Sequence, residues 1–161
     1  MRCALLSLHP CQALRAWACY SDRFTCGLGV FHAIDYIPPA ETPDKKYPLF
    51  LTTGRVLYQY HTGTMTMKSN GLNELAPASF VEISRKDADG VGIADGDLLR
   101  IASRRGEIKA KARISEIAVD GTVFMPFHYA EGAANVLTSK ALDPVAKIPE
   151  YKVCAVRLEK L

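Results

Sequence analysis

Gly54 and Arg55 are the first residues of the chain whose types and order could bind a charged ligand. They follow residues 48–53, an apolar and β-branched run that predicts a β-strand. A strand that ends in glycine and then arginine presents free backbone N–H groups beside a guanidinium that can donate two parallel hydrogen bonds. Such an arrangement suits a phosphate or pyrophosphate. The alternative is a strand, a turn and an ordinary surface arginine, because short glycine motifs also match by accident.

The loop after Arg55 adds further polar groups. Gln59 and His61 can hydrogen-bond a base or a phosphate, and Thr62 and Gly63 follow directly. His61 is a poor candidate for a metal ligand, because no second histidine, cysteine or carboxylate lies at a ligand spacing. An ordinary polar loop histidine is the alternative for His61. We therefore expect an anion- or nucleotide-binding loop here and no metal site.

Two later segments carry similar groups. Phe127 follows a predicted strand within an aromatic cluster, where either core packing or ligand contact would explain it. Asn135 lies in a turn of small residues, and its amide offers donors and acceptors together. Lys152 lies in an otherwise apolar final strand, so it is either an outward-facing charge or a phosphate partner. Ligand contacts of this kind belong on loops at strand ends, held by a rigid scaffold.

Short strands are the elements that must hold these loops. A weak edge strand is expected at 30–36, and residues 70–77 are expected to be an irregular connection. Ser84 predicts an N-cap, with Asp87 three residues later, for a helix of about two turns. Six or seven short strands with few helices predict a closed β-barrel, which leaves no unpaired edge. The principal predicted strands are 48–53, 80–83, 98–103, 108–115, 121–126 and 151–158.

The strand at 108–115 has the clearest pattern. Apolar residues alternate with Lys109, Lys111 and Arg113, so one face is expected to be buried and the other solvated. The three cations could be a phosphate track, but a solvated outer face is the better interpretation because charges on strands usually face water.

Composition excludes several classes of protein. The chain has 161 residues, enough for one domain with a buried core, and its net charge of +3 is too small to indicate nucleic-acid binding. No run of about 18 apolar residues predicts a membrane span, and the N-terminus matches a signal peptide only weakly. Residues 1–29 show no clear period and are expected to be a loosely ordered extension of unknown role before a domain at 30–161.

The five cysteines include no C-x-x-C pair, which argues against an iron–sulfur or zinc site. Their odd number argues against a closed disulfide framework. We therefore expect free thiols in a reducing, cytoplasmic compartment, with Cys154 as a small buried residue of the last strand.

Four segments together resemble the molybdopterin oxidoreductases, in particular their C-terminal molybdopterin dinucleotide-binding domain. The similarity is greatest to the catalytic subunit of formate dehydrogenases and covers residues 31–161 in order. Each motif alone is weak, but four in the right order and spacing are specific. The resemblance implies a mainly β fold, the double-psi β-barrel of six strands with two crossing loops. The four segments are LTTGR with HTGTMT, DGVGIADGDLLRIASRRGEIKAKA, VFMPFHYAEGAANVLT and ALDPVAKIPEYKVCAVRLE.

The resemblance also implies a ligand. This domain would bind the nucleotide and phosphate end of a molybdopterin guanine dinucleotide. Phe127 stands where many relatives carry a tyrosine, which removes a possible hydroxyl contact. The cofactor contacts that the resemblance and the residue types together predict are Gly54, Arg55, Gln59, His61, Thr62, Phe127, Asn135 and Lys152.

Other parts of the family's complete enzyme have no counterpart in this chain. In the family, the iron–sulfur cysteines, the ligand of the molybdenum or tungsten, and the histidine and arginine beside the formate all lie far upstream of this domain. We therefore expect no catalytic residue, no metal ligand and no iron–sulfur cluster here. The expected partners are the remaining domains or subunits of a dehydrogenase that converts formate to carbon dioxide.

Three alternatives remain open from the sequence. One is a small cofactor-binding subunit of a related enzyme such as formylmethanofuran dehydrogenase. Another is a barrel that only binds other proteins. The third, a self-processing barrel decarboxylase, is disfavoured because no obvious Gly-Ser processing site is present.

Overall fold

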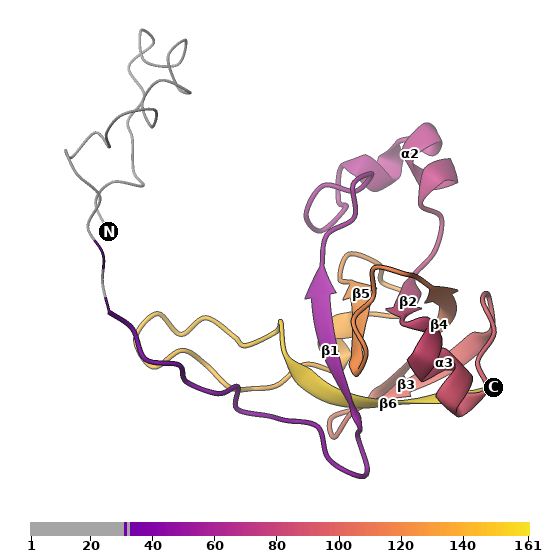
Figure 1. Cartoon of the computed structure of the whole chain (residues 1–161). Coiled ribbons are helices and arrows are strands. Elements are labelled where there is room, and N and C mark those ends of the chain that lie inside the picture. Colours follow the sequence, from indigo (N-terminus) through magenta and orange to yellow (C-terminus); the bar gives the residue numbers. More distant parts are fainter. Residues whose placement is uncertain (1–30, 32) are drawn as a thin grey trace, which may run out of the picture. The chain divides into compact units, whose positions relative to one another are not determined.

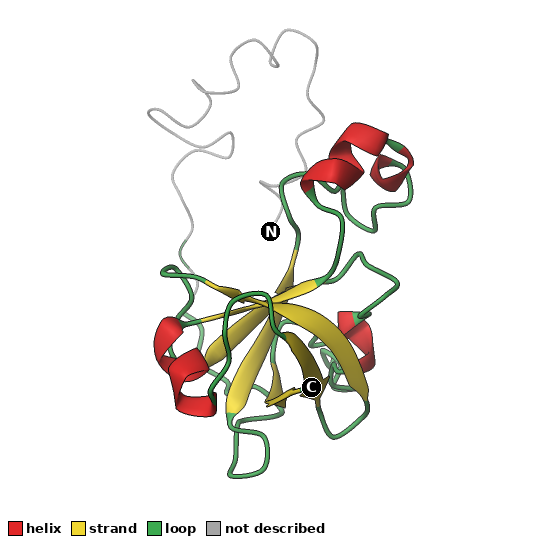
Figure 2. Ribbon diagram, turned by 90° about the vertical axis from the view of Figure 1, so that its right-hand side faces the viewer, coloured by secondary structure: helices red, strands yellow, loops and turns green. Residues whose placement is uncertain are grey.

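The computed structural model describes residues 31 and 33–161, and its barrel-forming unit runs from Pro38 to Leu161. Six strands close into a barrel in which every strand has two hydrogen-bonded neighbours (Figures 1 and 2). The extension predicted at residues 1–29 lies outside the described residues. The strands are β1 (Leu49–Gly54), β2 (Phe80–Ile83), β3 (Leu98–Ala102), β4 (Glu107–Ile114), β5 (Thr122–Pro126) and β6 (Cys154–Lys160).

The strand order around the barrel is β1-β5-β2-β4-β3-β6. β1 pairs with β5 and β2 with β4 in parallel, and the other pairs are antiparallel. This mainly β, double-psi β-barrel confirms the predicted fold. The edge strand predicted at 30–36 is wrong, because the described residues of that segment, 31 and 33–36, form no strand. The closed barrel offers no free edge for a seventh strand to join.

Period-two alternation places the core inside the barrel. In β4, Ala110 and Ala112 are buried while Lys109, Lys111 and Arg113 are exposed, which confirms the predicted solvated face. Such alternation gives each strand one apolar face for the interior and one polar face for water. Cys154 lies in the core as predicted. Residues with almost no exposed surface come from the five strands other than β4 and include Leu51, Val81, Ile83, Leu99, Ile101, Val123, Met125 and Val156.

Two helices connect the strands. α3 (Arg85–Val91) begins as predicted, because the Ser84 hydroxyl accepts a hydrogen bond from the Asp87 N–H at 3.2 Å. It ends at Gly92, whose φ of +68° is the left-handed conformation of a helix C-cap. α2 (Asn70–Leu75) corrects the prediction of an irregular connection at 70–77. Figure 1 shows α2 beyond the end of β1, away from the barrel wall.

Strand directions bring three connections to one end of the barrel. β1 and β5 end side by side, with Gly54 opposite Pro126. The pairing pattern makes β3 end there too, while β2, β4 and β6 begin there. Residues 55–79, 103–106 and 127–153 therefore all leave or enter the barrel at this end, which we call the loop end.

No helix in the described part of the chain is both long enough and apolar enough to cross a membrane.

Candidate functional site

The site begins where β1 and β5 end. The Phe127 N–H donates to the Gly54 carbonyl oxygen at 3.2 Å and continues the parallel pairing into the loops. Gly54 is required here by close packing, since a Cβ on it would lie 2.5 Å from the Phe124 ring. The absence of a side chain therefore lets an aromatic ring cover the backbone at the point where β1 enters the candidate loop.

Arg55 follows at once and is exposed. Its guanidinium forms neither a hydrogen bond nor an ion pair with any described residue of the chain. A guanidinium without an intramolecular partner at a strand end keeps all five donors available for an anion.

Lys152 joins the same region from the far end of the chain. Its ammonium donates to the Thr53 carbonyl oxygen and lies 5.8 Å from the centre of the Phe127 ring. The Thr53 hydroxyl in turn donates to the Tyr151 carbonyl oxygen at 2.7 Å. These bonds hold Lys152 at the end of β1, before β6 begins. Lys152 therefore lies beside Phe127 and the candidate loop, and not within the final strand as predicted, because β6 begins only at Cys154.

His61 completes this group. Its ring meets the Phe127 ring edge-on, with 5.8 Å between the ring centres and 69° between their planes. The φ of His61 is +51°, which only a minority of non-glycine residues adopt. Contacts to Phe127 thus link Gly54, Lys152 and His61, although nearly 100 residues separate Gly54 from Lys152.

Gln59 has a different environment from the one predicted. It is 2% exposed, its amide nitrogen donates to Asn73 at 3.2 Å, and its amide oxygen accepts from the Thr66 hydroxyl at 2.6 Å. These bonds tie the loop to α2. Thr62 is exposed and shares a hydrogen bond of 2.8 Å with the Thr64 hydroxyl.

Asn135 lies on a separate part of the loop end. It belongs to a short 3-10 helix, η3 (Ala134–Val136), and is exposed. The Arg105 guanidinium donates to the Leu137 carbonyl oxygen at 2.7 and 2.9 Å and holds this turn against the β3–β4 hairpin. Among the described residues, no hydrogen bond or ring contact links Asn135 to the group around Phe127.

His128 and Tyr129 belong to the aromatic cluster after β5, and the sequence carries no signal of their separate roles. Their ring centres lie 3.8 Å apart with the planes tilted by 40°, and both residues are buried. The Tyr129 hydroxyl donates to the Ala76 carbonyl oxygen at 2.9 Å, which fastens the segment after α2 to the end of β5. Burial lowers the pKa of His128, so the imidazole is neutral at physiological pH.

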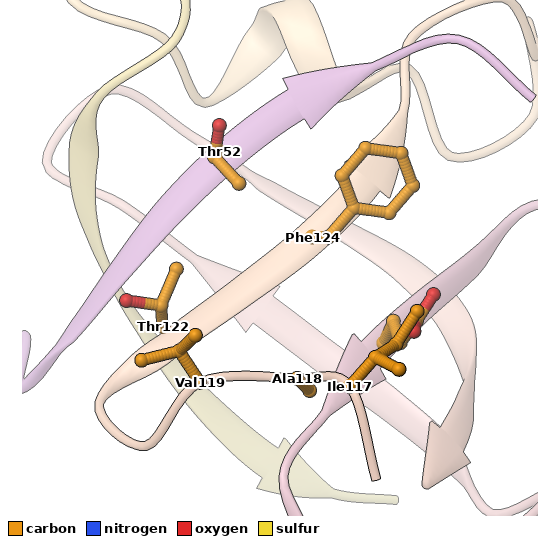
Figure 3. Close-up of a pocket in the computed structure, with 7 residues that line it drawn as sticks. Thr52, Ile117, Ala118, Val119, Thr122 and Phe124 are labelled. Carbon is orange, nitrogen blue, oxygen red and sulfur yellow. The ribbon is translucent and has the colours of Figure 1, made fainter. Parts of the chain in front are cut away.

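A hollow of about 320 Å³ lies on the outer face of the barrel, between β1, β2, β5 and residues 117–119 (Figure 3). Its lining is mostly apolar, with the Glu82 carboxylate at one side. None of the residues predicted to bind the cofactor lines it. The turn that closes it, residues 117–119, follows β4 at the barrel end opposite the loop end, so this hollow is distinct from the candidate site.

The described residues contain neither a metal-binding cluster nor a reactive thiol. No group of three or more His, Cys, Asp or Glu among residues 31 and 33–161 could hold a metal ion. Burial raises the pKa of the Cys154 thiol to about 11, although the nearby Arg105 charge acts in the opposite direction. Cys154 is therefore a neutral core residue and no nucleophile at physiological pH.

Fold and site together define a barrel that presents cations, polar loop groups and aromatic rings at one end, as a nucleotide- or phosphate-binding domain does. The chain belongs to the molybdopterin dinucleotide-binding domain family, since the family model "Molydopterin dinucleotide binding domain" matches residues 49–155. This match confirms the family predicted from the four segments, and it starts and ends within the barrel.

Three curated proteins show which members of the family this chain resembles. The chain is 50% identical over 144 residues to the F420-dependent formate dehydrogenase subunit alpha of Methanocaldococcus jannaschii, covering 88% of this chain and 21% of that protein. It is 50% identical over 135 residues to the F420-dependent formate dehydrogenase 1 subunit alpha of Methanococcus maripaludis, covering 84% and 20%. A periplasmic nitrate reductase of Desulfovibrio desulfuricans is 42% identical over 121 residues, covering 75% and 16%. The chain thus spans about a fifth of the length of the formate dehydrogenase subunits.

Among solved structures, acetylene hydratase from Pelobacter acetylenicus superimposes with a TM-score of 0.62 at 18% identity. The match covers 71% of this chain and 18% of that protein. At this identity the likeness supports the fold alone.

Proposed function

We propose that residues 30–161 bind the guanine nucleotide and diphosphate of a molybdopterin guanine dinucleotide as one domain of a formate dehydrogenase. Family membership supports a molybdopterin dinucleotide as the ligand. The observation that carries the placement is the Arg55 guanidinium, which has no partner among the described residues and lies beside Gly54, at the end where β1 and β5 meet. The formate dehydrogenase assignment rests on the similarity to two alpha subunits.

The residues of the loop end fit such a ligand in charge and shape. Arg55 and Lys152 offer positive charge for the diphosphate, and Gly54 lets β1 pack closely under the Phe124 ring at the point where Arg55 enters the loop. Phe127 offers an aromatic edge beside His61. Thr62 and Asn135 offer exposed polar groups for the sugar or base, while Gln59 acts from beneath by shaping the loop through its bonds to Asn73 and Thr66.

The chain's own part in catalysis is to hold and orient the cofactor. When bound in the complete enzyme, the cofactor supplies a molybdenum or tungsten centre for the oxidation of formate to carbon dioxide. The partners are the other domains or subunits of that enzyme, since the alpha subunits are about five times as long as the match. A cytoplasmic location is consistent with the odd number of cysteines and the lack of paired spacings.

Guanosine diphosphate (GDP) tests this proposal, because it contains the base, sugar and diphosphate without the pterin. We expect the full chain to bind GDP weakly in calorimetric titration, since the domains that would enclose the cofactor are absent. Arg55→Ala should weaken binding about tenfold, or about 1.4 kcal/mol, because a charge-assisted bidentate contact is lost.

Arg113→Ala is the matched control, since it removes an arginine from the exposed face of β4. Its affinity for GDP should equal that of the unmodified chain. Loss of binding in Arg113→Ala together with unchanged binding in Arg55→Ala would move the site to the basic strand and refute the placement.

A further inference from the structure

His128 is a buried polar residue whose hydrogen-bonding groups are unpaired in the described part of the chain. It is 7% exposed, and neither ring nitrogen has a hydrogen-bond partner among the described residues. A neutral imidazole carries one donor and one acceptor. Leaving both unpaired inside a protein is unfavourable, and a purely structural position would favour an apolar ring of the same size.

The neighbouring polar groups are already used. The Tyr129 hydroxyl donates to the Ala76 carbonyl oxygen, so its hydrogen is not available to His128. The Gly63 N–H donates to the Tyr60 carbonyl oxygen at 2.9 Å, and the Gly63 carbonyl oxygen accepts from the Met67 N–H at 2.8 Å. None of these groups bonds to the imidazole, so in this structure both ring nitrogens are open to a partner from outside the described residues.

The imidazole lies directly behind the candidate loop. A Cβ placed on Gly63 would lie 3.5 Å from Cδ2 of His128 and 2.8 Å from the sulfur of Met67. His128 and Met67 thus pack against the same glycine, two residues after His61. Met67 is unbranched and 39% exposed, so its side chain can change rotamer without disturbing the barrel core.

We propose that His128 is a further ligand contact, whose imidazole pairs with an uncharged polar edge of the bound nucleotide, on the base or the sugar. The proposal rests on the proposed function and assigns a separate task within it. Phosphate oxygens are bound best by cations, which Arg55 and Lys152 supply. A neutral imidazole with one donor and one acceptor instead suits a group that offers both, such as a base edge or a sugar hydroxyl.

Replacement of His128 by phenylalanine separates a ligand contact from a packing role. His128→Phe keeps an aromatic ring and removes both nitrogens. We expect the melting temperature of the free chain to stay the same or rise, because unpaired buried polar atoms are removed. GDP affinity should fall about fivefold, the change that corresponds to about 1 kcal/mol. Thermal unfolding and calorimetric titration with GDP measure the two quantities on one preparation.

Tyr129→Phe is the matched control from the same pair of neighbouring rings. It removes a hydroxyl that is satisfied in the fold, so its melting temperature should fall while its GDP affinity stays unchanged. In the unmodified chain, ¹⁵N NMR of the His128 imidazole should show one ring nitrogen shifting toward its hydrogen-bonded value when GDP is added. This measurement does not depend on the stability of any variant.

The outcomes are distinct. Equal GDP affinity in His128→Phe and the unmodified chain, or imidazole nitrogens that do not respond to GDP, would overturn the role of His128 while leaving the proposed function standing. Failure of the unmodified chain to bind GDP would overturn the proposed function and the role of His128 with it.

Discussion

Arg55 and Arg105 both follow a strand that ends at the loop end of the barrel, yet their surroundings are opposite. Arg105 donates to the Glu41 carboxylate and to the Leu137 carbonyl oxygen, and its side chain is 20% exposed. Arg55 is exposed and forms no bond with a described residue. One side of the loop end, around Arg105, is thus held by bonds within the chain, and we call it the closed side. The other, around Arg55, has a free guanidinium in the described part of the chain, and we call it the open side.

Glu41 shows how the closed side is built. Its carboxylate accepts from Arg105, from Arg104 at 2.8 Å, and from the Ala155 N–H at 2.8 Å, so it joins the segment before β1 to the β3–β4 hairpin and to β6. Burial works to raise the pKa of Glu41, but the hydrogen bonds from Arg105 and Ala155 and the two arginine charges outweigh it and hold the pKa below 4.5. Saturated polar groups of this kind indicate a structural role, whereas unsatisfied ones beside a loop indicate a ligand.

Glu41→Ala should have the largest effect on stability. It leaves Arg105 and the Ala155 N–H without their shared acceptor in a largely buried position, which should cost about 3 kcal/mol of unfolding free energy. Binding of GDP by the folded variant should be unchanged, because Glu41 bonds to the closed side. Chemical denaturation of the two proteins measures the difference. A folded Glu41→Ala variant that fails to bind GDP would contradict the assignment of a structural role to the closed side and of ligand binding to the open side.

The depressed pKa of Glu41 also fixes the sign of a pH effect. Because its pKa is lower in the folded state, Glu41 contributes stability above about pH 4.5 and loses that contribution as the pH falls through the folded pKa. The stability gap between the unmodified chain and Glu41→Gln should therefore be full at pH 7 and narrow in acid. Glu74→Ala, which alters an exposed carboxylate of α2 that forms no hydrogen bond or ion pair with a described residue, is the control and should change stability little.

Gly54→Ala should have the next largest effect. The added methyl would lie 2.5 Å from the Phe124 ring, so the ring must move and stability should fall by about 1.5 kcal/mol. Combining it with Phe124→Ala should remove this cost, since the clash disappears. A double-mutant cycle by thermal unfolding gives the coupling. Additive effects would show that Gly54 is needed for another reason, such as ligand approach.

The sequence predicted the local parts of this structure well. Ser84 and Asp87 predicted the start of α3, and the lysines and arginine of β4 predicted its outer face. Both predictions succeed because each pattern depends only on residues close together in the sequence. α2 gave no such signal. It has six residues, includes Gly71 and has no side-chain cap, and the bonds of Asn73 to Gln59 and to the Met67 carbonyl oxygen help to hold it. The formation of α2 therefore depends on contacts with other segments more than on its own sequence.

The sequence indicated which strand ends carry the candidate residues, but it could not show their contacts. Gly54, Phe127 and Lys152 come from different predicted strand ends, and the structure brings them together. The sequence could not show that Gln59 is buried in bonds to its own loop, or that Glu41 and Arg105 meet across 64 residues. It also could not show that His128 is buried without a hydrogen-bond partner in the described part of the chain. Each of these depends on distant segments.

Arg55→Lys refines the open side of the comparison. Lysine keeps the charge but lacks the planar pair of donors, so GDP affinity should fall about fivefold, or about 1 kcal/mol, less than in Arg55→Ala. Stability should be unchanged because Arg55 has no bond to break within the described chain. Titration beside Arg55→Ala measures the difference. Equal affinity of Arg55→Lys and the unmodified chain would mean that charge alone is required there.

Arg113→Ala should have the smallest effect. It tests whether an exposed arginine elsewhere on the barrel resembles Arg55 or Arg105 in its role. Its guanidinium lies over the Phe80 ring, 3.6 Å from the ring centre, on the outer face shared by β2 and β4. Loss of this cation–π contact should cost about 0.5 kcal/mol of stability. GDP affinity should not change, because β4 begins at the loop end and Arg113 lies near its far end. Thermal unfolding with Phe80→Leu as the partner variant isolates the contact. An Arg113→Ala chain that is as stable as the unmodified one but binds GDP less tightly would identify the outer strand face as a second anion-binding surface, and exposure alone would no longer distinguish a solvated arginine from a functional one.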